Sequence, residues 1–278
     1  MSSQFELPTP RDSGVTPNGT AWSLFGSGPV VVLIHGVGMQ QAYWAPQVND
    51  LMQDFTVLTY DMWGHGKTIV NDAAVSMDDF SGQLRDLLDF HAIEKASIVG
   101  HSLGALNTMH FLRHHADRCE SAVVLNIVFD RTDAQREPVR KRAQDLKDTG
   151  TMTIDVTLER WFGKPDETQY PEAYTLCKHL LESVNGAGYA NAYMLFATAQ
   201  DISHAELAAL PTRILFATGD GDPNSTPAMS HAMAQIAPNG ECVVINDHRH
   251  MMSLTAIDAV NDLIRKTVNN EEIAGGES

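Results

Sequence analysis

One serine in this sequence lies in a setting that would make it a nucleophile. The motif Gly100-His101-Ser102-Leu103-Gly104 directly follows a run typical of a buried strand, 96–99, and directly precedes a helical pattern over 105–115. The two glycines permit a turn too sharp for flanking side chains, so the serine hydroxyl is presented at the edge of the sheet. Backbone amides at the start of the helix then point toward the group that is attacked. The motif predicts acyl transfer at Ser102.

A serine needs a base and a group that orients the base. Residues of both types follow further along the chain, where expected strands end. Asp220 and Asp222 lie in the loop after a strand expected at 213–217, and His248 and His250 follow one expected at 242–245. The residues alone leave both aspartates and both histidines as candidates.

The elements that must position these residues alternate between strand and helix from about residue 20. Short apolar runs at 30–35, 55–60, 96–99 and 122–125 are typical of strands buried on both faces of a parallel sheet. Helical patterns such as 77–91 separate these runs, which implies right-handed crossovers. The sequence predicts the α/β class, with a mostly parallel central sheet and helices on both faces.

The alternation stops after Asn126 and resumes at Arg213. The stretch between them shows several helical segments, broken near Gly150, 163–165 and 185–188, and no convincing strand. We expect a first core part at 1–128, a helical cap at 129–210 inserted after the sixth strand, and a second core part at 211–278. Such a cap would cover the carboxyl ends of the strands, where open α/β sheets bind ligands.

Composition restricts the partners and the compartment. The 278 residues carry 19 Lys and Arg against 35 Asp and Glu, a net charge of −16 that repels nucleic acid and anionic membranes. Three cysteines without a close pair argue against a disulfide framework, and no run approaches the ~18 apolar residues of a membrane span. With no basic, apolar leader, we expect a cytoplasmic protein with a small-molecule substrate. The sequence leaves monomer and homodimer open.

The chain resembles the α/β-hydrolase fold enzymes from about residue 20 to 268, with the family's order of serine, aspartate and histidine. The resemblance implies that His35-Gly36-Val37-Gly38 is the oxyanion loop, with the N–H groups of Val37 and Leu103 as donors. It implies that the turn 60–66 is a supporting element. It favours Asp222 as the acid, from the G-x-x-D pattern, with Asp220 as the alternative. It favours His250 as the base, because the segment 258–261 resembles the start of the helix that follows the family's histidine, at the spacing counted from His250.

The cap segments 128–132 and 158–162 resemble those of 3-oxoadipate enol-lactonase-like hydrolases, as does Pro227-Ala228-Met229. That resemblance implies a small carboxylated lactone, ester or amide from a catabolic pathway. Five residues then become candidates for substrate binding: Met39 and Tyr43 at the entrance, Arg131 and Arg160 as carboxylate clamps, and Trp161. An ion pair between Arg160 and a cap acid, with Trp161 in the cap core, is an equally good interpretation.

Two other functions stay open: a C–C bond hydrolase of ring-cleavage products, and a non-catalytic binding module on the same scaffold. Nucleotide motifs fail, because Asp61 and Gln41 stand where phosphate-binding loops need glycine. His110 and His114 lie one helical turn apart, but Phe111 replaces the glutamate of the zinc-protease motif. A metal held by His248, His250 and the two loop aspartates is the weaker interpretation of those residues. The sequence therefore predicts neither a metal nor a cofactor.

Overall fold

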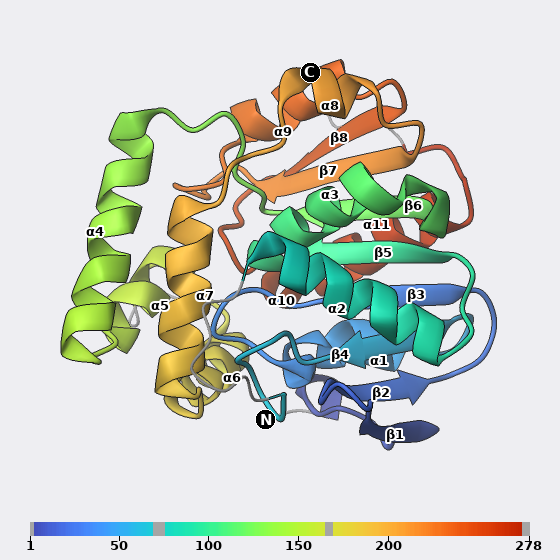
Figure 1. Cartoon of the computed structure of the whole chain (residues 1–278), viewed down its shortest axis with the longest axis horizontal. Coiled ribbons are helices and arrows are strands. Elements are labelled where there is room, and N and C mark those ends of the chain that lie inside the picture. Colours follow the sequence, from blue (N-terminus) through green and yellow to red (C-terminus); the bar gives the residue numbers. More distant parts are fainter. Residues whose placement is uncertain (1–2, 69–75, 165–168, 274–278) are drawn as a thin grey trace.

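An eight-stranded sheet forms the centre of the computed structural model, which describes residues 3–68, 76–164 and 169–273 (Figure 1). The order across the sheet is β1-β2-β4-β3-β5-β6-β7-β8, and the pairs from β4 to β8 are all parallel. The strands are β1 (Asp12–Val15), β2 (Ala21–Phe25), β3 (Val30–Ile34), β4 (Thr56–Tyr60), β5 (Ala96–His101), β6 (Cys119–Leu125), β7 (Arg213–Gly219) and β8 (Gly240–Ile245). The predicted α/β class with a mostly parallel sheet is confirmed.

The antiparallel edge made by β1 and β2 is the part of the sheet that the sequence pattern did not reveal. β2 pairs antiparallel with both β1 and β4. All four residues of β1, Asp-Ser-Gly-Val, are exposed, so this strand carries no hydrophobic alternation that could predict it. In contrast, β3 has four fully buried apolar residues, because it is central in the sheet and helices cover both faces of the sheet.

Helices cover the sheet on both sides. In Figure 1, α2 (Met77–Phe90) and α3 (Leu103–His115) lie in front of the sheet and α11 (Ile257–Val268) lies behind it. The remaining core helices are α1 (Ala45–Leu51), α9 (Pro227–Ile236) and α10 (Met252–Thr255), with 3-10 turns at Ser3–Phe5, Gln41–Trp44 and Ala116–Arg118. The short helix α8 (His204–Ala208) lies at the end of the segment between β6 and β7. Helix α2 begins at a capping box, in which Ser76 and Asp79 satisfy each other's backbone N–H groups. These helices bury the apolar core on which the site rests.

Four long helices stand between β6 and β7: α4 (Asp133–Thr149), α5 (Ile154–Phe162), α6 (Pro171–Glu182) and α7 (Gly186–Thr198). They lie beyond the carboxyl ends of the parallel strands, at the left of Figure 1. Helix α4 ends at Gly150, whose φ of 64° suits the left-handed cap of a helix. Helix α5 ends at the expected break beside Gly163, while Pro165 of that break lies outside the described residues. We use "cap" below for residues 129–210.

Among the residues that the structure describes, no helix is long and apolar enough to cross a membrane.

Candidate active site

The turn from β5 into α3 holds Ser102 in a strained conformation. Its φ of 56° and ψ of −114° place a non-glycine residue in a region that L-residues rarely adopt. A Cβ at Gly100 would collide with the Gly104 carbonyl and the Thr108 hydroxyl, and one at Gly104 would collide with the Ile34 carbonyl. The two glycines are therefore required for the close packing that presents the serine at the strand end.

The structure brings the three residues favoured by the motifs into one chain of contacts. The His250 Nε2 atom lies 3.1 Å from the Ser102 Oγ atom. The Nδ1 atom of the same ring lies 2.7 Å from the Asp222 Oδ2 atom. All three side chains are buried, although they come from the ends of β5, β7 and β8. This is the geometry in which an imidazole can take a proton from a hydroxyl while a carboxylate fixes its tautomer.

The carboxylate of Asp222 is held ionised by donors on every side. The backbone N–H groups of Asn224 and Ser225 donate to Oδ1 at 2.9 and 3.1 Å. Burial by itself would raise the pKa of Asp222, but His250 and these amides outweigh it and hold that pKa below its usual value. Asp220, the alternative acid, is exposed on the surface.

Asn126 is a further residue of this network that the sequence analysis did not assign. It directly follows β6, and its Nδ2 atom donates to the Asp222 Oδ2 atom at 2.9 Å. Its backbone has a φ of 52°, and its carbonyl accepts a 2.7 Å hydrogen bond from the Ser225 hydroxyl. Its place at the carboxyl end of a central parallel strand was the available signal. Asn126 fixes the same carboxylate oxygen that faces His250.

The loop after β3 is held by two neutral histidines. The Nε2 atom of His65 accepts a 3.0 Å hydrogen bond from the Gly38 N–H, and that of His35 accepts one of 3.0 Å from the Met62 N–H. Burial lowers the pKa of His35 to about 4 and that of His65 to about 3, so both rings are uncharged at neutral pH. The turn 60–66 therefore supports the loop that carries Val37.

The two residues predicted as oxyanion donors lie near the serine. Leu103 is the first residue of α3, where a backbone N–H has no acceptor within the helix. Val37 lines the same cavity as Ser102 and His250.

That cavity has a volume of about 230 Å³ and lies between the core and the cap. The core contributes Val37, Ser102, Val128, Pro223, Asn224, Met229 and His250; the cap contributes Arg131, Gln135, Pro138, Val139, Arg142, Thr157, Arg160, Trp161, Tyr193 and Phe196. The volume is below the usual range of about 300–1,000 Å³ for ligand pockets, which favours a small ligand.

Trp161, on the cap helix α5, contacts His250 of the core. Its ring stacks on the His250 ring with centroids 6.0 Å apart and planes 24° from parallel. Trp161 also lines the cavity, where the sequence predicted a substrate-binding residue. Its ring covers the imidazole from the cap side.

The two arginines predicted as clamps have different surroundings. Arg131 forms a buried ion pair with Asp201, with its Nη2 atom 2.8 Å from Oδ1, and Arg136 pairs with the other oxygen of that carboxylate. Two backbone carbonyls also accept from Arg131. The prediction of Arg131 as a carboxylate clamp is therefore corrected, because its charge and its donors are already used within the protein.

Arg160 faces the cavity together with Arg142, which the sequence analysis did not single out. Both guanidinium groups donate to hydroxyls. The Arg160 Nη2 atom lies 3.4 Å from the Thr157 Oγ1 atom, and the Arg142 Nε atom lies 3.2 Å from the Tyr193 hydroxyl. Burial lowers the pKa of Arg160, and the positive charge of Arg142 lowers it further. Within the described part of the chain, neither guanidinium forms an ion pair with a carboxylate. The pair makes this end of the cavity electropositive.

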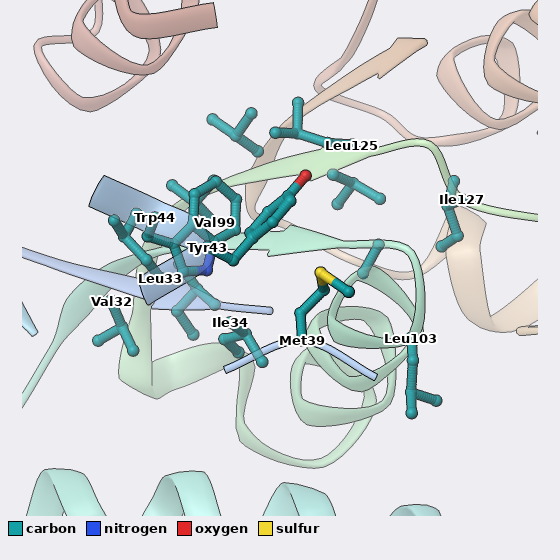
Figure 2. Close-up of a cluster of buried hydrophobic side chains, with 14 of the residues drawn as sticks. Val32, Leu33, Ile34, Met39, Tyr43, Trp44, Val99, Leu103, Leu125 and Ile127 are labelled. Carbon is teal, nitrogen blue, oxygen red and sulfur yellow. The ribbon is translucent and has the colours of Figure 1, made fainter. Parts of the chain in front are cut away.

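Met39 and Tyr43 do not line the entrance, contrary to the prediction. Met39 is 1% exposed and Tyr43 is fully buried, and Figure 2 shows both within the hydrophobic cluster under the loop. The Tyr43 ring stacks on His101, whose Nε2 atom is 2.8 Å from the His250 carbonyl oxygen. The side chains of these two residues are buried in the core and do not line the cavity.

The alternative metal interpretation of the loop residues is not supported by their placement. The His248 ring bonds to the Thr255 hydroxyl at 2.8 Å, whereas the His250 ring is bonded to Ser102 and Asp222. In the described ranges, the His, Cys, Asp and Glu residues that converge closely enough to bind a metal are at another place.

The chain is similar to known hydrolases over most of its length. A profile described as Alpha/beta hydrolase family matches residues 31–263. The (E)-2-((N-methylformamido)methylene)succinate hydrolase of Acinetobacter baylyi is 36% identical over 240 residues, which cover 86% of this chain and 90% of that protein. The 3-oxoadipate enol-lactonase 1 of the same organism is 29% identical over 81% of this chain and 83% of its own.

A solved structure shares the fold. The enol-lactonase of Burkholderia xenovorans superposes with a TM-score of 0.81 and 24% identity, covering 93% of this chain and all of that one. With a family match over most of its length, the chain belongs to the α/β hydrolase family. Its relatives are named as hydrolases, and this protein is a hydrolase of that family.

Proposed function

We propose that the protein hydrolyses an acyl bond, an amide, ester or enol-lactone, in a small substrate that carries two carboxylates. The observation that supports this substrate class is the pair Arg142 and Arg160, which faces the cavity next to Ser102 and His250 without a carboxylate partner in the described chain. A half-buried cation is costly unless an anion pairs with it. Two such cations in a cavity of about 230 Å³ favour a small dianion.

In the proposed reaction, the Ser102 hydroxyl attacks the substrate carbonyl and His250 accepts its proton. The N–H groups of Val37 and Leu103 stabilise the oxyanion. The protonated His250 then donates to the leaving nitrogen or oxygen, which departs and leaves an acyl-enzyme on Ser102. Water, activated by the same imidazole, cleaves this ester and restores the serine. Asp222 keeps the Nδ1 proton of His250 in place throughout, and Asn126 holds Asp222.

The guanidinium groups explain how a protein with a net charge of −16 would bind an anion. The overall field repels a dicarboxylate, so the attraction must be local. Arginine forms bidentate hydrogen bonds with carboxylates, and such charge-assisted bonds are about twice as strong as neutral ones. Binding both carboxylates at the cap end would hold the rest of the molecule against Ser102.

The most informative relative supports the same class. The name of the A. baylyi hydrolase describes a succinate, a dicarboxylate, that carries a formamide. We therefore place amide hydrolysis of a substituted methylenesuccinate first among the reactions to test, ahead of enol-lactone hydrolysis.

The test compares two substrates and four proteins. An N-acylaminomethylene-succinate and its analogue lacking one carboxylate would be assayed for kcat/KM with wild type, Arg142→Met, Arg160→Met and Arg140→Met. Arg140 is an exposed residue of the same helix as Arg142 and serves as the matched control. We expect each cavity variant to lose roughly 10- to 100-fold on the dicarboxylate, the value of one charge-assisted contact.

The analogue separates binding from folding. For the analogue, kcat/KM should fall less than about threefold in at least one of the cavity variants. The reason is that the analogue leaves one guanidinium without a carboxylate partner in wild type as well. Equal kcat/KM for both substrates in wild type, or unchanged values in both cavity variants, would contradict the proposed substrate class. Tight binding of the dicarboxylate without turnover would support the binding-module alternative.

A further inference from the structure

A group of potential metal ligands lies outside the active site, on the surface formed by α2 and α3. Asp78 belongs to the first turn of α2, while His110 and His114 lie one turn apart on α3. The two helices are neighbours in front of the sheet in Figure 1. Each of the three residues offers one ligand atom, and these atoms all lie within 4.8 Å of one another. Asp78 is 32 or more positions away from the two histidines in sequence.

The side chains are already directed toward one another. The His110 Nε2 atom lies 2.7 Å from the Asp78 Oδ1 atom, and the two imidazole centroids are 4.9 Å apart. In a tetrahedral zinc site, nitrogen and oxygen ligands lie about 2.0–2.2 Å from the metal. Ligand atoms around such an ion are roughly 3.3 Å apart, so small side-chain rotations would suffice here.

We propose that Asp78, His110 and His114 form a binding site for a divalent first-row cation, with Zn²⁺ as the preferred ion. Imidazole nitrogens with one carboxylate oxygen are a ligand set suited to zinc. Asp78 and His114 are exposed, so the metal would reach the site from solvent and keep water in its remaining position. On binding, the neutral His110 ring takes the tautomer with its single proton on Nδ1, so that the Nε2 lone pair can coordinate the metal.

The charges around the three side chains favour a cation. Asp78 contributes a carboxylate, and the two imidazoles contribute ring nitrogens as neutral ligands. Arg113 is the nearby cation that opposes binding, and its Nη2 atom is paired with Glu206 at 2.5 Å. The net charge of −16 attracts cations in addition.

The proposed site is separate from the acyl-transfer site. His110 is eight residues along α3 from Ser102, which corresponds to about 12 Å of helix. A metal here would connect the first turn of α2 to the helix that carries the serine at its start. Its expected effect is on stability, with no part in the acyl transfer.

The experiment is a titration of the purified, chelator-treated full chain with Zn²⁺, in which isothermal calorimetry measures the heat of binding. We expect one equivalent to bind, with a dissociation constant in the micromolar range or tighter. Asp78→Asn, His110→Ala and His114→Ala should each weaken binding at least tenfold. His231→Ala, an exposed histidine on α9, is the matched control and should bind as wild type does.

Two further readouts separate coordination from nonspecific binding. Co²⁺ should give the visible absorption of a tetrahedral complex in wild type, and this absorption should be lost in His114→Ala. Zn²⁺ should raise the melting temperature of wild type and of His231→Ala, but not that of His114→Ala. No binding below 1 mM, or an affinity equal to that of wild type in all three ligand variants, would overturn the proposal. Circular dichroism of each variant excludes misfolding as the reason for a loss of binding.

Discussion

The two walls of the active-site cavity are built in different ways. The core wall consists of residues at strand ends, Ser102, Asp222 and His250, each fixed by short hydrogen bonds to buried neighbours. The cap wall consists of side chains on helices, among which Arg142 and Arg160 donate to hydroxyls at 3.2 and 3.4 Å. The polar groups of the core wall are hydrogen-bonded within the protein, whereas the two guanidinium groups have no carboxylate partner among the residues that the structure describes.

This difference indicates how the work is divided. A preorganised core wall suits bond-making steps, in which donors must be in position before charge develops. An electropositive cap wall suits selection of the substrate, because its charges are paired only when the ligand is bound. The comparison predicts that core variants lower kcat, whereas cap variants change which substrate is used.

The largest effect is expected for Asp222→Asn. An amide in place of the carboxylate would direct its N–H₂ group against Asn126 or His250 and favour the wrong tautomer of the imidazole. We expect kcat to fall on the order of 10⁴-fold, as for the equivalent change in serine proteases. Asp220→Asn, two residues away and exposed, is the control and should stay within twofold of wild type. Comparable losses in the two variants would break the assignment of the acid.

Three buried, neutral histidines of the core, His35, His65 and His101, predict a loss of stability in acid. The pKa is lowered to about 4 for His35 and to about 3 for both His65 and His101, mainly by burial. The unfolded chain takes up protons on these rings below pH 6.5 and the folded chain does not, so their contribution is present above pH 6.5 and is lost as the pH falls. Between pH 7 and pH 5 each ring should cost roughly 2 kcal/mol of unfolding free energy.

Urea unfolding at the two pH values measures this cost. His65→Gln keeps an acceptor for the Gly38 N–H without a titrating ring, and it should remove about a third of the drop assigned to the three rings. Exposed His231→Ala should leave the drop unchanged. The same unfolding free energy at pH 7 and pH 5 in wild type would show that these rings are not held neutral by the fold.

Asn126 tests whether the core wall depends on residues that do not touch the substrate. Asn126→Ala removes the donor to the Asp222 Oδ2 atom. We expect kcat/KM to fall roughly 10- to 100-fold, the value of a hydrogen bond to a charged group. Asn126→Asp would place a second carboxylate beside Asp222, raise the pKa of Asp222 and move the acid limb of the pH–rate profile upward. An unchanged profile in Asn126→Asp would reduce Asn126 to a structural role.

The smallest effect is expected for Trp161, where the two walls meet. Its ring covers His250, and a cation–π contact with the protonated imidazole contributes roughly 0.5–1 kcal/mol. Trp161→Leu should therefore lower kcat about threefold, and Trp161→Phe should restore most of it. Full activity in Trp161→Leu would show that the stacking has no part in the reaction.

The three residues of the core wall could be predicted from the sequence because each has a signal in its immediate sequence neighbourhood. The glycine pattern around Ser102 and the strand ends before Asp222 and His250 are visible in short windows, and the structure places these residues in contact. Asn126 was missed because an asparagine after a strand has no motif of its own. Its role depends on Asp222, 96 residues away.

The cap wall was predicted poorly because its contacts are distant in sequence. Arg131 was expected to bind a carboxylate from the substrate, but it pairs with Asp201, 70 residues further on. Met39 and Tyr43 are near the oxyanion loop in sequence, yet their side chains point into the core. Arg142 had one available signal, since it shares a helical face with Val139 at a spacing of three.

Intact-mass spectrometry after treatment with a small fluorophosphonate tests most directly whether Ser102 is the nucleophile. We expect one adduct on wild type, located on Ser102 by peptide mapping, and none on Ser102→Ala. An excess of a dicarboxylate substrate analogue should slow labelling of wild type but not of the Arg142→Met and Arg160→Met double variant. An adduct that persists in Ser102→Ala, or the absence of any adduct on wild type, would contradict the assignment of Ser102 as the nucleophile.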